Sequence, residues 1–375
     1  MQKVNSFYFF QPGSIIFERG CLEKGLKEAS ALGLRALVVC GRHFASRTGL
    51  LEKVKKILES AGLVCTLYDR VKPEPDVENV EQGADICRRA GCDLVVAVGG
   101  GSALDAGKAI AVLATNPGRL ADYFGQENFP TCPLPVVAIP TTCGTGSEVT
   151  RYAVIVDRQA ETKKTISSLQ IIPKIAILDS DLLKTLPARL VAATAMDAFS
   201  HAVESFLARR ANYLSRGFSR MALKALSKGL PGAVRDKDPD SFKEQVFFGS
   251  LVAGLAINHT GTIMVHGMGY AFTIRYGVHH GTANAVVLAP VLEYLKTKGQ
   301  EKEISELETF WGGPAGLKKL LQEMKLPSKL SEFGVEEKDI GELVRLAVIG
   351  CQRAVKNMFV APEKKDYEQI LRSIL

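Results

Sequence analysis

Hydrophobic residues in the first half of the chain form short runs separated by amphipathic stretches. The runs are rich in Val, Ile and Leu, which is typical of buried strands. Between them, apolar residues recur every three or four positions, which predicts helices. The predicted strands cover 35–40, 63–68, 94–98, 135–139, 152–156 and 175–178, and the predicted helices cover 43–60, 76–90 and 103–115. This alternation predicts a doubly wound parallel sheet.

The pattern changes near residue 185, beyond which only helical periodicity is convincing. The predicted helices there cover 188–216, 219–233, 242–257, 262–272, 282–296, 317–324 and 340–348. A chain of 375 residues exceeds what one hydrophobic core usually supports. We therefore predict an N-terminal α/β domain over 1–185 and an all-α C-terminal domain over 186–375.

Composition and charge narrow the class of protein. A hydrophobic fraction of 46% and a charged fraction of 23% are typical of a soluble globular protein. The net charge of +7 is spread along the chain, so no nucleic-acid partner is expected. We find no apolar run long enough to cross a membrane and no secretion signal. The eight cysteines form no Cys-x-x-Cys pair, which favours reduced thiols in a cytoplasmic protein.

Two predicted strands end in loops rich in glycine and hydroxyl groups. The first loop contains Gly99-Gly-Gly-Ser102 and the second contains Thr141, Thr142 and 144–148. Glycines let the backbone approach a phosphate closely, and a following helix offers free N–H groups. The first loop lacks the G-x-G-x-x-G fingerprint, and three glycines often form a simple tight turn. Two such loops at one sheet edge nevertheless fit a bound dinucleotide.

The second half contains a candidate metal site. Asp197 and His201 are four residues apart in a predicted helix and so share one face. His266 and His280 follow, and one carboxylate with three imidazoles suits Fe(II), Zn(II) or a neighbouring first-row metal. A single Asp-x-x-x-His pair is common without any metal. Here, however, four of the six histidines lie beyond position 258, which strengthens the metal hypothesis.

These motifs together resemble the iron-dependent (group III) alcohol dehydrogenases, which share a fold with glycerol dehydrogenase and dehydroquinate synthase. The resemblance rests on four motifs in the family's order. They are Gly99-Gly-Gly-Ser102 with Asp105 and Lys108; Thr141-Thr142 with 144–148; Asp197-x-x-x-His201 with Glu204; and His266, followed by His280 and Asn284. The resemblance implies a dehydroquinate synthase-like fold, with an N-terminal dinucleotide-binding domain and a C-terminal metal-binding domain.

The resemblance also implies roles for individual residues. The metal ligands would be Asp197, His201, His266 and His280, with Fe(II) as the metal and Zn(II) as the alternative. His280 is preferred to His279 because it directly precedes Gly281-Thr-Ala-Asn-Ala. The implied cofactor residues are Gly99, Gly100, Gly101 and Ser102 at the pyrophosphate, Asp105 near the nicotinamide, Thr141, Thr142 and Thr145 along the cofactor, and Lys164 at the ribose. Lys163 is adjacent and leaves the choice of lysine open.

Two positions depart from the family pattern. Many relatives have an aspartate after the first strand that binds the adenosine ribose, whereas this chain has Gly41 followed by Arg42. Glycine admits a 2′-phosphate and arginine can pair with it, so we expect NADP(H) to be favoured over NAD(H). The alternative is that Arg42 is simply solvated and both cofactors bind. Many relatives also have a histidine where this chain has Tyr270, so the proton relay is open among Tyr270, His279, water and no side chain.

The implied activity is that of a metal-dependent NAD(P)(H)-linked alcohol dehydrogenase or aldehyde reductase, acting on short-chain primary alcohols, diols or aldehydes. A homodimer or larger homo-oligomer is expected. The apolar residues expected to line the substrate pocket are Phe199, Phe206, Leu255, Ile257 and Tyr270. The alternatives are a glycerol dehydrogenase, a dehydroquinate synthase-like enzyme or a nucleotide-binding protein without turnover. The first two usually have fewer or different metal ligands.

Overall fold

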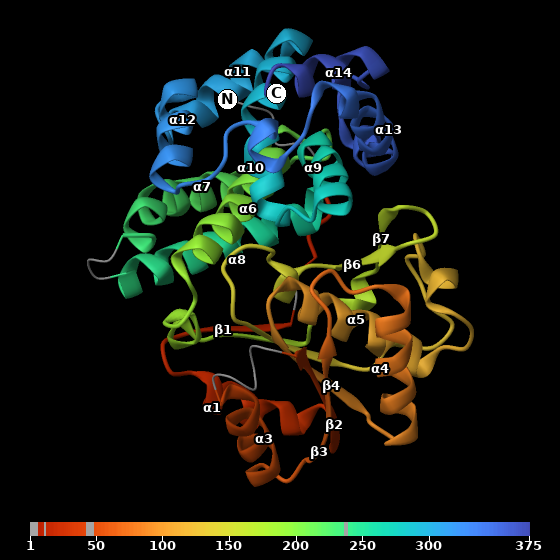
Figure 1. Cartoon of the computed structure of the whole chain (residues 1–375). Coiled ribbons are helices and arrows are strands. Elements are labelled where there is room, and N and C mark those ends of the chain that lie inside the picture. Colours follow the sequence, from red (N-terminus) through yellow and green to blue (C-terminus); the bar gives the residue numbers. More distant parts are fainter. Residues whose placement is uncertain (1–6, 11–12, 43–48, 236–238) are drawn as a thin grey trace. The chain divides into compact units, whose positions relative to one another are not determined.

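The computed structural model describes residues 7–10, 13–42, 49–235 and 239–375, which divide into two compact units (Figure 1). The α/β unit contains 13–142 and Ser147–Thr185. The helical unit contains 7–10, Cys143–Gly146 and Leu186–Leu375. A short loop after the fifth strand therefore belongs to the helical unit although it is embedded in the sequence of the other.

The α/β unit is built on a six-stranded parallel sheet with strand order β1-β8-β5-β4-β2-β3. Its strands are β1 (Ser14–Phe17), β2 (Arg35–Gly41), β3 (Val64–Val71), β4 (Leu94–Gly99), β5 (Val136–Pro140) and β8 (Ile175–Leu178). Every residue of β4 is buried, because helices cover both faces of the sheet. The predicted parallel sheet is confirmed, but β1 was missed.

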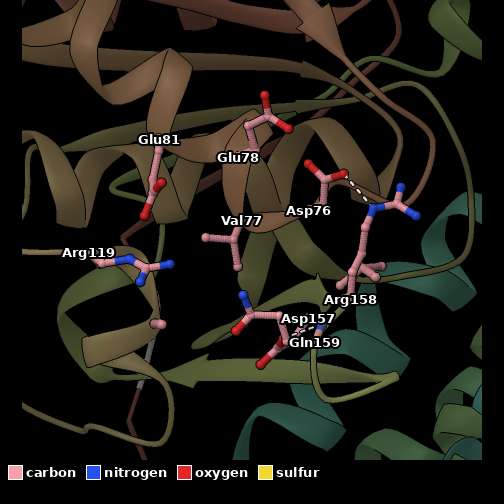
Figure 2. Close-up of a pocket in the computed structure, with 10 residues that line it drawn as sticks. Asp76, Val77, Glu78, Glu81, Arg119, Asp157, Arg158 and Gln159 are labelled. Atoms are coloured by element: carbon pink, nitrogen blue, oxygen red, sulfur yellow. Dashed lines mark hydrogen bonds and ion pairs between the residues drawn. The ribbon is translucent and has the colours of Figure 1, made fainter.

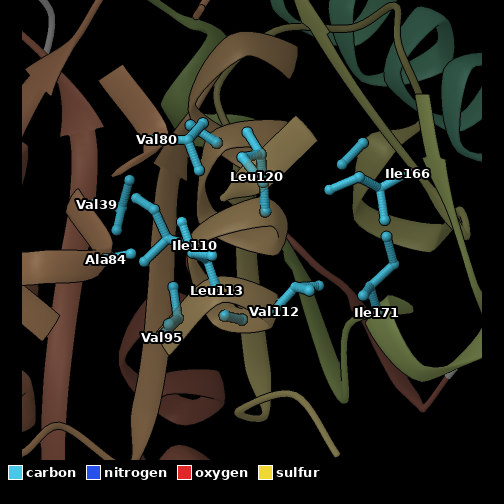
Figure 3. Close-up of a cluster of buried hydrophobic side chains, with 14 of the residues drawn as sticks. Val39, Val80, Ala84, Val95, Ile110, Val112, Leu113, Leu120, Ile166 and Ile171 are labelled. Carbon is cyan, nitrogen blue, oxygen red and sulfur yellow. The ribbon is translucent and has the colours of Figure 1, made fainter. Parts of the chain in front are cut away.

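Helices α1 (Leu22–Glu28), α3 (Leu50–Ser60), α4 (Val77–Arg89) and α5 (Gly101–Thr115) cover the sheet. On one face, Val39 and Val95 of the strands pack with Val80 of α4 and Ile110 of α5 (Figure 3). On the other face, the strands pack against α1 and α3. That second cluster includes Leu26, Val38, Val54, Leu58 and Val96. The predicted helix over 43–60 begins at Leu50 in the described residues, and 43–48 lie outside them.

The chain reverses its direction of travel across the sheet between β2 and β4. It passes from β2 outward to β3, and then returns to β4 on the other side of β2. The carboxyl ends of β2 and β4 therefore border a topological switch point, where open α/β sheets bind their ligands. Gly41 ends β2 and Gly99 ends β4, so the sequence-predicted cofactor residues lie at this edge.

A separate antiparallel hairpin pairs β6 (Tyr152–Asp157) with β7 (Thr162–Ser167). The strand at 152–156 was predicted. Strand β7 was missed because Thr162-Lys-Lys-Thr165 offers no apolar alternation.

The helical unit is built around α6 (Ala188–Leu207), whose residues 191–207 are all buried. Helix α6 packs against α7, α8 and α10. The remaining helices are α7 (Tyr213–Ala233), α8 (Pro239–Thr260), α9 (Met264–Tyr276), α10 (His280–Leu295), α11 (Glu301–Glu308), α12 (Gly313–Glu323), α13 (Ile340–Cys351) and α14 (Lys364–Arg372). No strand occurs among the described residues of this unit, as predicted.

The single helix predicted over 188–216 is two helices. Helix α6 ends where Ala208 adopts an extended conformation, and Asn212 then caps α7. The Asn212 side chain accepts hydrogen bonds from the backbone of Leu214 and Ser215, each at 3.0 Å. Neither glycine nor proline marks this break, so the asparagine cap was the only local signal.

Within the described residues, no individual helix is both long and apolar enough to cross a bilayer. Segments Asp240–Thr260 and Met264–Tyr276 are long and apolar enough only when they are taken together, and the chain bends by 109° between them.

Candidate metal centre

Helix α6 places Asp197 and His201 side by side. The two residues are one helical turn apart on the same face, as their spacing predicts. Both are almost fully buried, with exposed fractions of 3% and 6%. A carboxylate and an imidazole are therefore held together inside the helical unit.

Helices α9 and α10 bring His266 and His280 to the same point. The Nε2 atom of His266 lies 3.3 Å from Oδ1 of Asp197, and Nε2 of His280 lies 3.7 Å from that same oxygen. The rings of His201 and His266 stack at 4.4 Å, and those of His266 and His280 are 5.2 Å apart. Ligand atoms of Asp197, His201 and His266 all lie within 4.8 Å of one another. The structure thus gathers all four sequence-predicted ligands.

Gly281 makes this approach of α10 to α6 possible. A Cβ atom at Gly281 would lie 3.1 Å from Cβ of Asp197 and would collide with the carbonyl group of Ala193. Only a residue without a side chain leaves room for the α6 backbone at this point. The first residue of α10, His280, therefore sits beside Asp197.

The charges of the cluster suit a cation. Burial alone would raise the pKa of Asp197, but His201 and His280 beside it hold that pKa well below its usual range. Burial lowers the pKa of His201 to about 4, so this imidazole is neutral at neutral pH. Burial would also lower the pKa of His266, but Glu204 and Asp197 raise it to about 10. The centre combines a carboxylate with imidazoles of contrasting basicity.

Nδ1 of His201 and Nε2 of His266 are buried nitrogens of the cluster that receive no regular hydrogen bond from the described residues. Leaving buried polar atoms unpaired is costly, and such atoms call for an explanation. A divalent cation bound between Asp197 and the imidazoles accounts for the Nε2 atom of His266. The donor set therefore fits a first-row metal.

Two further residues organise the ligands, although sequence reasoning gave them no role. Asn284 donates from Nδ2 to Oδ1 of Asp197 at 2.8 Å, and its Nδ2 lies 3.2 Å from Nε2 of His280. Glu204 contacts Nδ1 of His266 through Oε2. One sequence signal pointed to Glu204, because it lies seven residues after Asp197 and three after His201 on the same helix face.

Of the two residues proposed for proton relay, Tyr270 lies against the cluster and His279 is exposed. The Tyr270 ring stacks on His280 with centroids 5.1 Å apart. The side chain of His279 is exposed, and its backbone forms the N-cap of α10. Tyr270 therefore contacts the cluster, whereas His279 precedes it in the chain and is open to solvent.

Two of the residues expected to line a substrate pocket are core residues instead. Phe199 and Phe206 have no exposed surface. Phe199 packs edge-on against Trp311 at 5.2 Å, and Phe206 lies under two arginine side chains. The error arose because closeness in sequence to a ligand does not fix the direction of a side chain on a helix. Ile257 is buried, and Leu255 is half-buried.

In the α/β unit, the two glycine-rich loops lie next to each other. The backbone N–H of Thr141 donates to the carbonyl of Gly99 at 2.9 Å. A Cβ at Gly100 would lie 3.2 Å from Cγ2 of Thr142. Helix α5 begins at Gly101, and its N-cap residue Gly100 supplies no side-chain cap. Its first N–H groups can therefore serve an anion, as the sequence predicted.

The carboxylate of Asp105 is engaged by its own unit. Its Oδ1 accepts a hydrogen bond from the Ser147 hydroxyl at 2.5 Å, and its Oδ2 accepts one from the backbone N–H of Val154 at 3.0 Å. The same Oδ1 lies 3.3 Å from Nζ of Lys108. These contacts hold the segment after β5 onto α5, which is a structural role that the sequence did not suggest.

The remaining cofactor residues are spread over both units. Thr145 belongs to the helical unit, unlike Thr141 and Thr142.

The two candidate lysines differ in exposure. The Lys164 side chain is 44% exposed and lies 3.9 Å from Asp157. The Lys163 side chain is only 5% exposed and pairs with Glu74 at 2.5 Å. The backbone N–H of Glu74 donates to the Ser102 hydroxyl at 3.3 Å. Lys163 is therefore linked through Glu74 to the Ser102 loop, whereas Lys164 is the more exposed of the two lysines.

Gly41 and Arg42 lie at the carboxyl end of β2. The nearest atom to a Cβ added at Gly41 is the carbonyl oxygen of Val71, at 3.6 Å, so a larger residue fits there. Arg42 is exposed.

A pocket in the α/β unit is bordered by Asp157, the ion-pair partner of Lys164 (Figure 2). It is lined by Asp76, Val77, Glu78, Glu81, Arg119, Ala121, Val156, Asp157, Arg158 and Gln159. Asp76 caps α4 and pairs with Arg158 at 2.9 Å. None of the sequence-predicted site residues lines this pocket.

Comparison with known proteins identifies the family. The family model "Iron-containing alcohol dehydrogenase" matches residues 12–180, and "Fe-containing alcohol dehydrogenase family, C-terminal" matches 191–375. Alcohol dehydrogenase 4 of Schizosaccharomyces pombe is 33% identical, over 91% of this chain and 82% of that protein. The 1,3-propanediol dehydrogenase of Klebsiella pneumoniae is 34% identical, over 96% of this chain and 94% of that protein.

Solved structures agree with these sequence matches. A crystal structure of a 1,3-propanediol oxidoreductase has a TM-score of 0.93 and 30% identity, covering 99% of this chain and 100% of its own. A structure of an iron-containing alcohol dehydrogenase has a TM-score of 0.90 and 30% identity, with 99% of each chain covered. The resemblance seen in the four sequence motifs is confirmed. The chain belongs to the iron-containing alcohol dehydrogenase family.

Proposed function

We propose that this protein interconverts alcohols and aldehydes with NAD(P)(H) at a divalent metal held by Asp197, His201, His266 and His280. The observation that carries the proposal is the buried cluster of one carboxylate and three imidazoles on α6, α9 and α10. When bound, the metal supplies a Lewis acid that polarises the substrate oxygen, and the nicotinamide supplies or accepts a hydride. Fe(II) is the proposed metal, with Zn(II) as the alternative.

The protein's own residues hold the metal ligands in place and orient them. Asn284 fixes the Asp197 carboxylate by donating to its Oδ1 at 2.8 Å, and burial of the cluster excludes water. The hydroxyl of Tyr270 is our candidate for proton transfer, because the Tyr270 ring stacks on His280. A Tyr270→Phe variant keeps the stacking ring and loses only the hydroxyl. We expect its activity to fall across the pH range, whereas unchanged activity would leave His279 or water as the relay.

We propose that the cofactor binds along the carboxyl edge of the sheet. Gly99, Gly100, Gly101 and Ser102 with the start of α5 receive the pyrophosphate, and Thr141, Thr142 and Thr145 contribute further contacts. For the ribose we favour Lys163 over Lys164, because Lys163 is the buried lysine linked through Glu74 to Ser102. Lys163→Ala should raise the KM for the cofactor more than its matched control, Lys164→Ala. If Lys164→Ala raised the KM more, Lys164 would be the lysine at the ribose.

We further propose that NADP(H) is favoured over NAD(H), because Gly41 offers no carboxylate to repel a 2′-phosphate and Arg42 follows it. One relative, from Bacillus methanolicus, is named an NAD-dependent methanol dehydrogenase. The names of relatives therefore do not support NADP(H), and the proposed preference rests on Gly41 and Arg42 alone. Gly41→Asp should shift the ratio of kcat/KM for the two cofactors toward NAD(H). Gly41→Ala adds a Cβ without charge and should leave that ratio unchanged. Equal ratios in both variants and the wild type would contradict the proposal.

The proposed substrates are short-chain primary alcohols, diols or aldehydes. This proposal follows the names of relatives, which include 1,3-propanediol dehydrogenases and a lactaldehyde reductase. Metal-loaded protein should oxidise reduced nicotinamide in the presence of butyraldehyde or 3-hydroxypropanal. The panel also includes longer aldehydes. If the protein turned over neither butyraldehyde nor 3-hydroxypropanal, the proposed substrate class would be wrong.

We also propose a cytoplasmic homodimer or larger homo-oligomer. All eight cysteines are free, which suits a reducing compartment. Light scattering coupled to gel filtration measures the oligomeric mass, and a monomer of 40.6 kDa would contradict the proposal.

A further inference from the structure

Glu204 is a buried carboxylate that bonds to the start of α9. It has no exposed surface. Its Oε1 accepts hydrogen bonds from three backbone N–H groups, those of Ile263 at 2.9 Å, Val265 at 3.0 Å and His266 at 3.4 Å. Helix α9 has no side-chain cap of its own at Ile263. A residue from α6 therefore satisfies N–H groups that a local cap normally serves.

The second oxygen of Glu204 contacts the imidazole of His266. Oε2 lies against Nδ1 of that ring. Oε1 of Glu204 already accepts from three backbone N–H groups, so the contact of Oε2 with the ring assigns Nδ1 of His266 as the donor. Nε2 of His266, which lies 3.3 Å from Oδ1 of Asp197, is then the nitrogen left to face a metal, and the metal displaces any proton held between these two atoms. The tautomer that Glu204 imposes is the one that a metal ligand needs.

We propose that Glu204 is a positioning residue that fixes the tautomer and ring orientation of His266 for metal binding. The inference rests on the ligand set of the proposed function. Because the same carboxylate holds the start of α9, the helix that carries His266 is positioned by the group that orients its ring. All of these contacts are with α9, so Glu204 acts through the start of that helix and through the His266 ring.

The variant Glu204→Gln separates the two tasks of the side chain. Three backbone N–H groups require an acceptor, so the amide oxygen must take the place of Oε1. The amide NH₂ group then faces Nδ1 of His266 and donates to it. That reversal moves the imidazole proton to Nε2, where it blocks metal binding. The helix start keeps its hydrogen bonds, so the fold should survive.

The test measures Zn(II) affinity of the metal-stripped full-length protein by competition with a chromophoric chelator. We expect the dissociation constant of Glu204→Gln to rise about 10- to 100-fold, with little change in the thermal midpoint of the metal-free protein. Wild-type affinity in this variant would overturn the proposal. If wild-type protein itself bound no Zn(II), the proposed function would fail instead.

Asp179→Asn is the matched control. Asp179 is a buried carboxylate in the α/β unit that accepts backbone hydrogen bonds from Gly20, Leu22 and Asp181. Its amide variant should lower stability without changing the Zn(II) dissociation constant. An equal loss of affinity in both variants would show that general destabilisation explains the effect and would overturn the role of Glu204.

A second measurement does not depend on the folding of Glu204→Gln. In wild-type protein labelled with ¹⁵N-histidine and loaded with Zn(II), the nitrogen shifts of His266 report its tautomer. The resonance is assigned by its loss in His266→Gln. We expect a protonated Nδ1 and a metal-bound Nε2. A protonated Nε2, or a metal on Nδ1, would overturn the proposal.

Discussion

At the scale of single residues, Lys108 is a fully buried ammonium group. Its Nζ contacts the backbone carbonyls of Ser147, Thr150 and Tyr152 and lies 3.3 Å from Oδ1 of Asp105. Burial lowers the pKa of Lys108, against the attraction of Asp105. The charge is therefore held by one carboxylate and three carbonyl dipoles, which tie the segment after β5 to α5.

Replacing Lys108 by methionine should be strongly destabilising. The change leaves three carbonyls without their donor and removes the cation beside Asp105, which keeps its hydrogen bonds from Ser147 and Val154; breaking such a buried ion pair costs about 3–5 kcal/mol. Urea denaturation measures the loss. Lys56→Met removes an exposed lysine and serves as the control, with an expected change within about 0.5 kcal/mol. A similar small change in Lys108→Met would mean that the carbonyls find other partners.

Glu148 should make the stability of the α/β unit depend on pH. Burial raises the pKa of Glu148 from 4.5 to about 7, and Lys108 only partly opposes this shift. The folded protein thus holds a proton that the unfolded chain has lost. The stabilising contribution is complete below pH 4.5 and disappears as the pH rises to about 7. The whole change is about 3 kcal/mol.

Denaturation of Glu148→Gln at pH 5 and pH 8 tests this account. The amide cannot ionise, so the variant should lose less stability than the wild type over this interval. Parallel losses in both proteins would assign the pH dependence to other groups.

At the scale of elements, the approach of α10 to α6 depends on Gly281. Gly281→Ala should push the start of α10 away from Ala193 and move His280 from Asp197. We expect the metal dissociation constant to rise about 10- to 100-fold. Gly341→Ala is the control, because a Cβ at that helical position meets no atom within 4 Å. Unchanged metal affinity in Gly281→Ala would show that α10 has more freedom than its packing indicates.

Most elements could be predicted from periodicity, and the failures have physical causes. Strands β2, β4 and β5 are continuous apolar runs because both sheet faces are covered. Strand β7 escaped notice because its residues 162–165 are polar or charged. The break between α6 and α7 depends on the backbone at Ala208 and on the Asn212 cap, neither of which interrupts the helical period.

At the scale of the whole molecule, the metal centre is a tertiary feature. Local spacing alone pairs Asp197 with His201, since both lie on α6. No local rule connects them to His266 and His280, which come from α9 and α10. The concentration of histidines beyond position 258 suggested that connection, and the family resemblance then implied the ligand set. Helix spacing places Glu204 on the face of Asp197 and His201, but its contact with His266 and that of Asn284 with Asp197 join different helices and could not be read from local spacing. Phe199 and Phe206 were misjudged because closeness in sequence to a ligand does not fix the direction of a side chain on a helix.

The central claim is that one buried metal, held by Asp197 and three histidines, is required for nicotinamide-linked turnover. The most direct test strips the protein of metal, restores Fe(II) or Zn(II) without oxygen, and follows NADPH or NADH loss with butyraldehyde. The same preparation of His280→Ala is measured beside it for metal content and activity. We predict that wild-type protein regains one metal and turnover, fastest with Fe(II) and NADPH, while the variant loses both together. Full activity in metal-free protein, or in a variant without bound metal, would contradict the account.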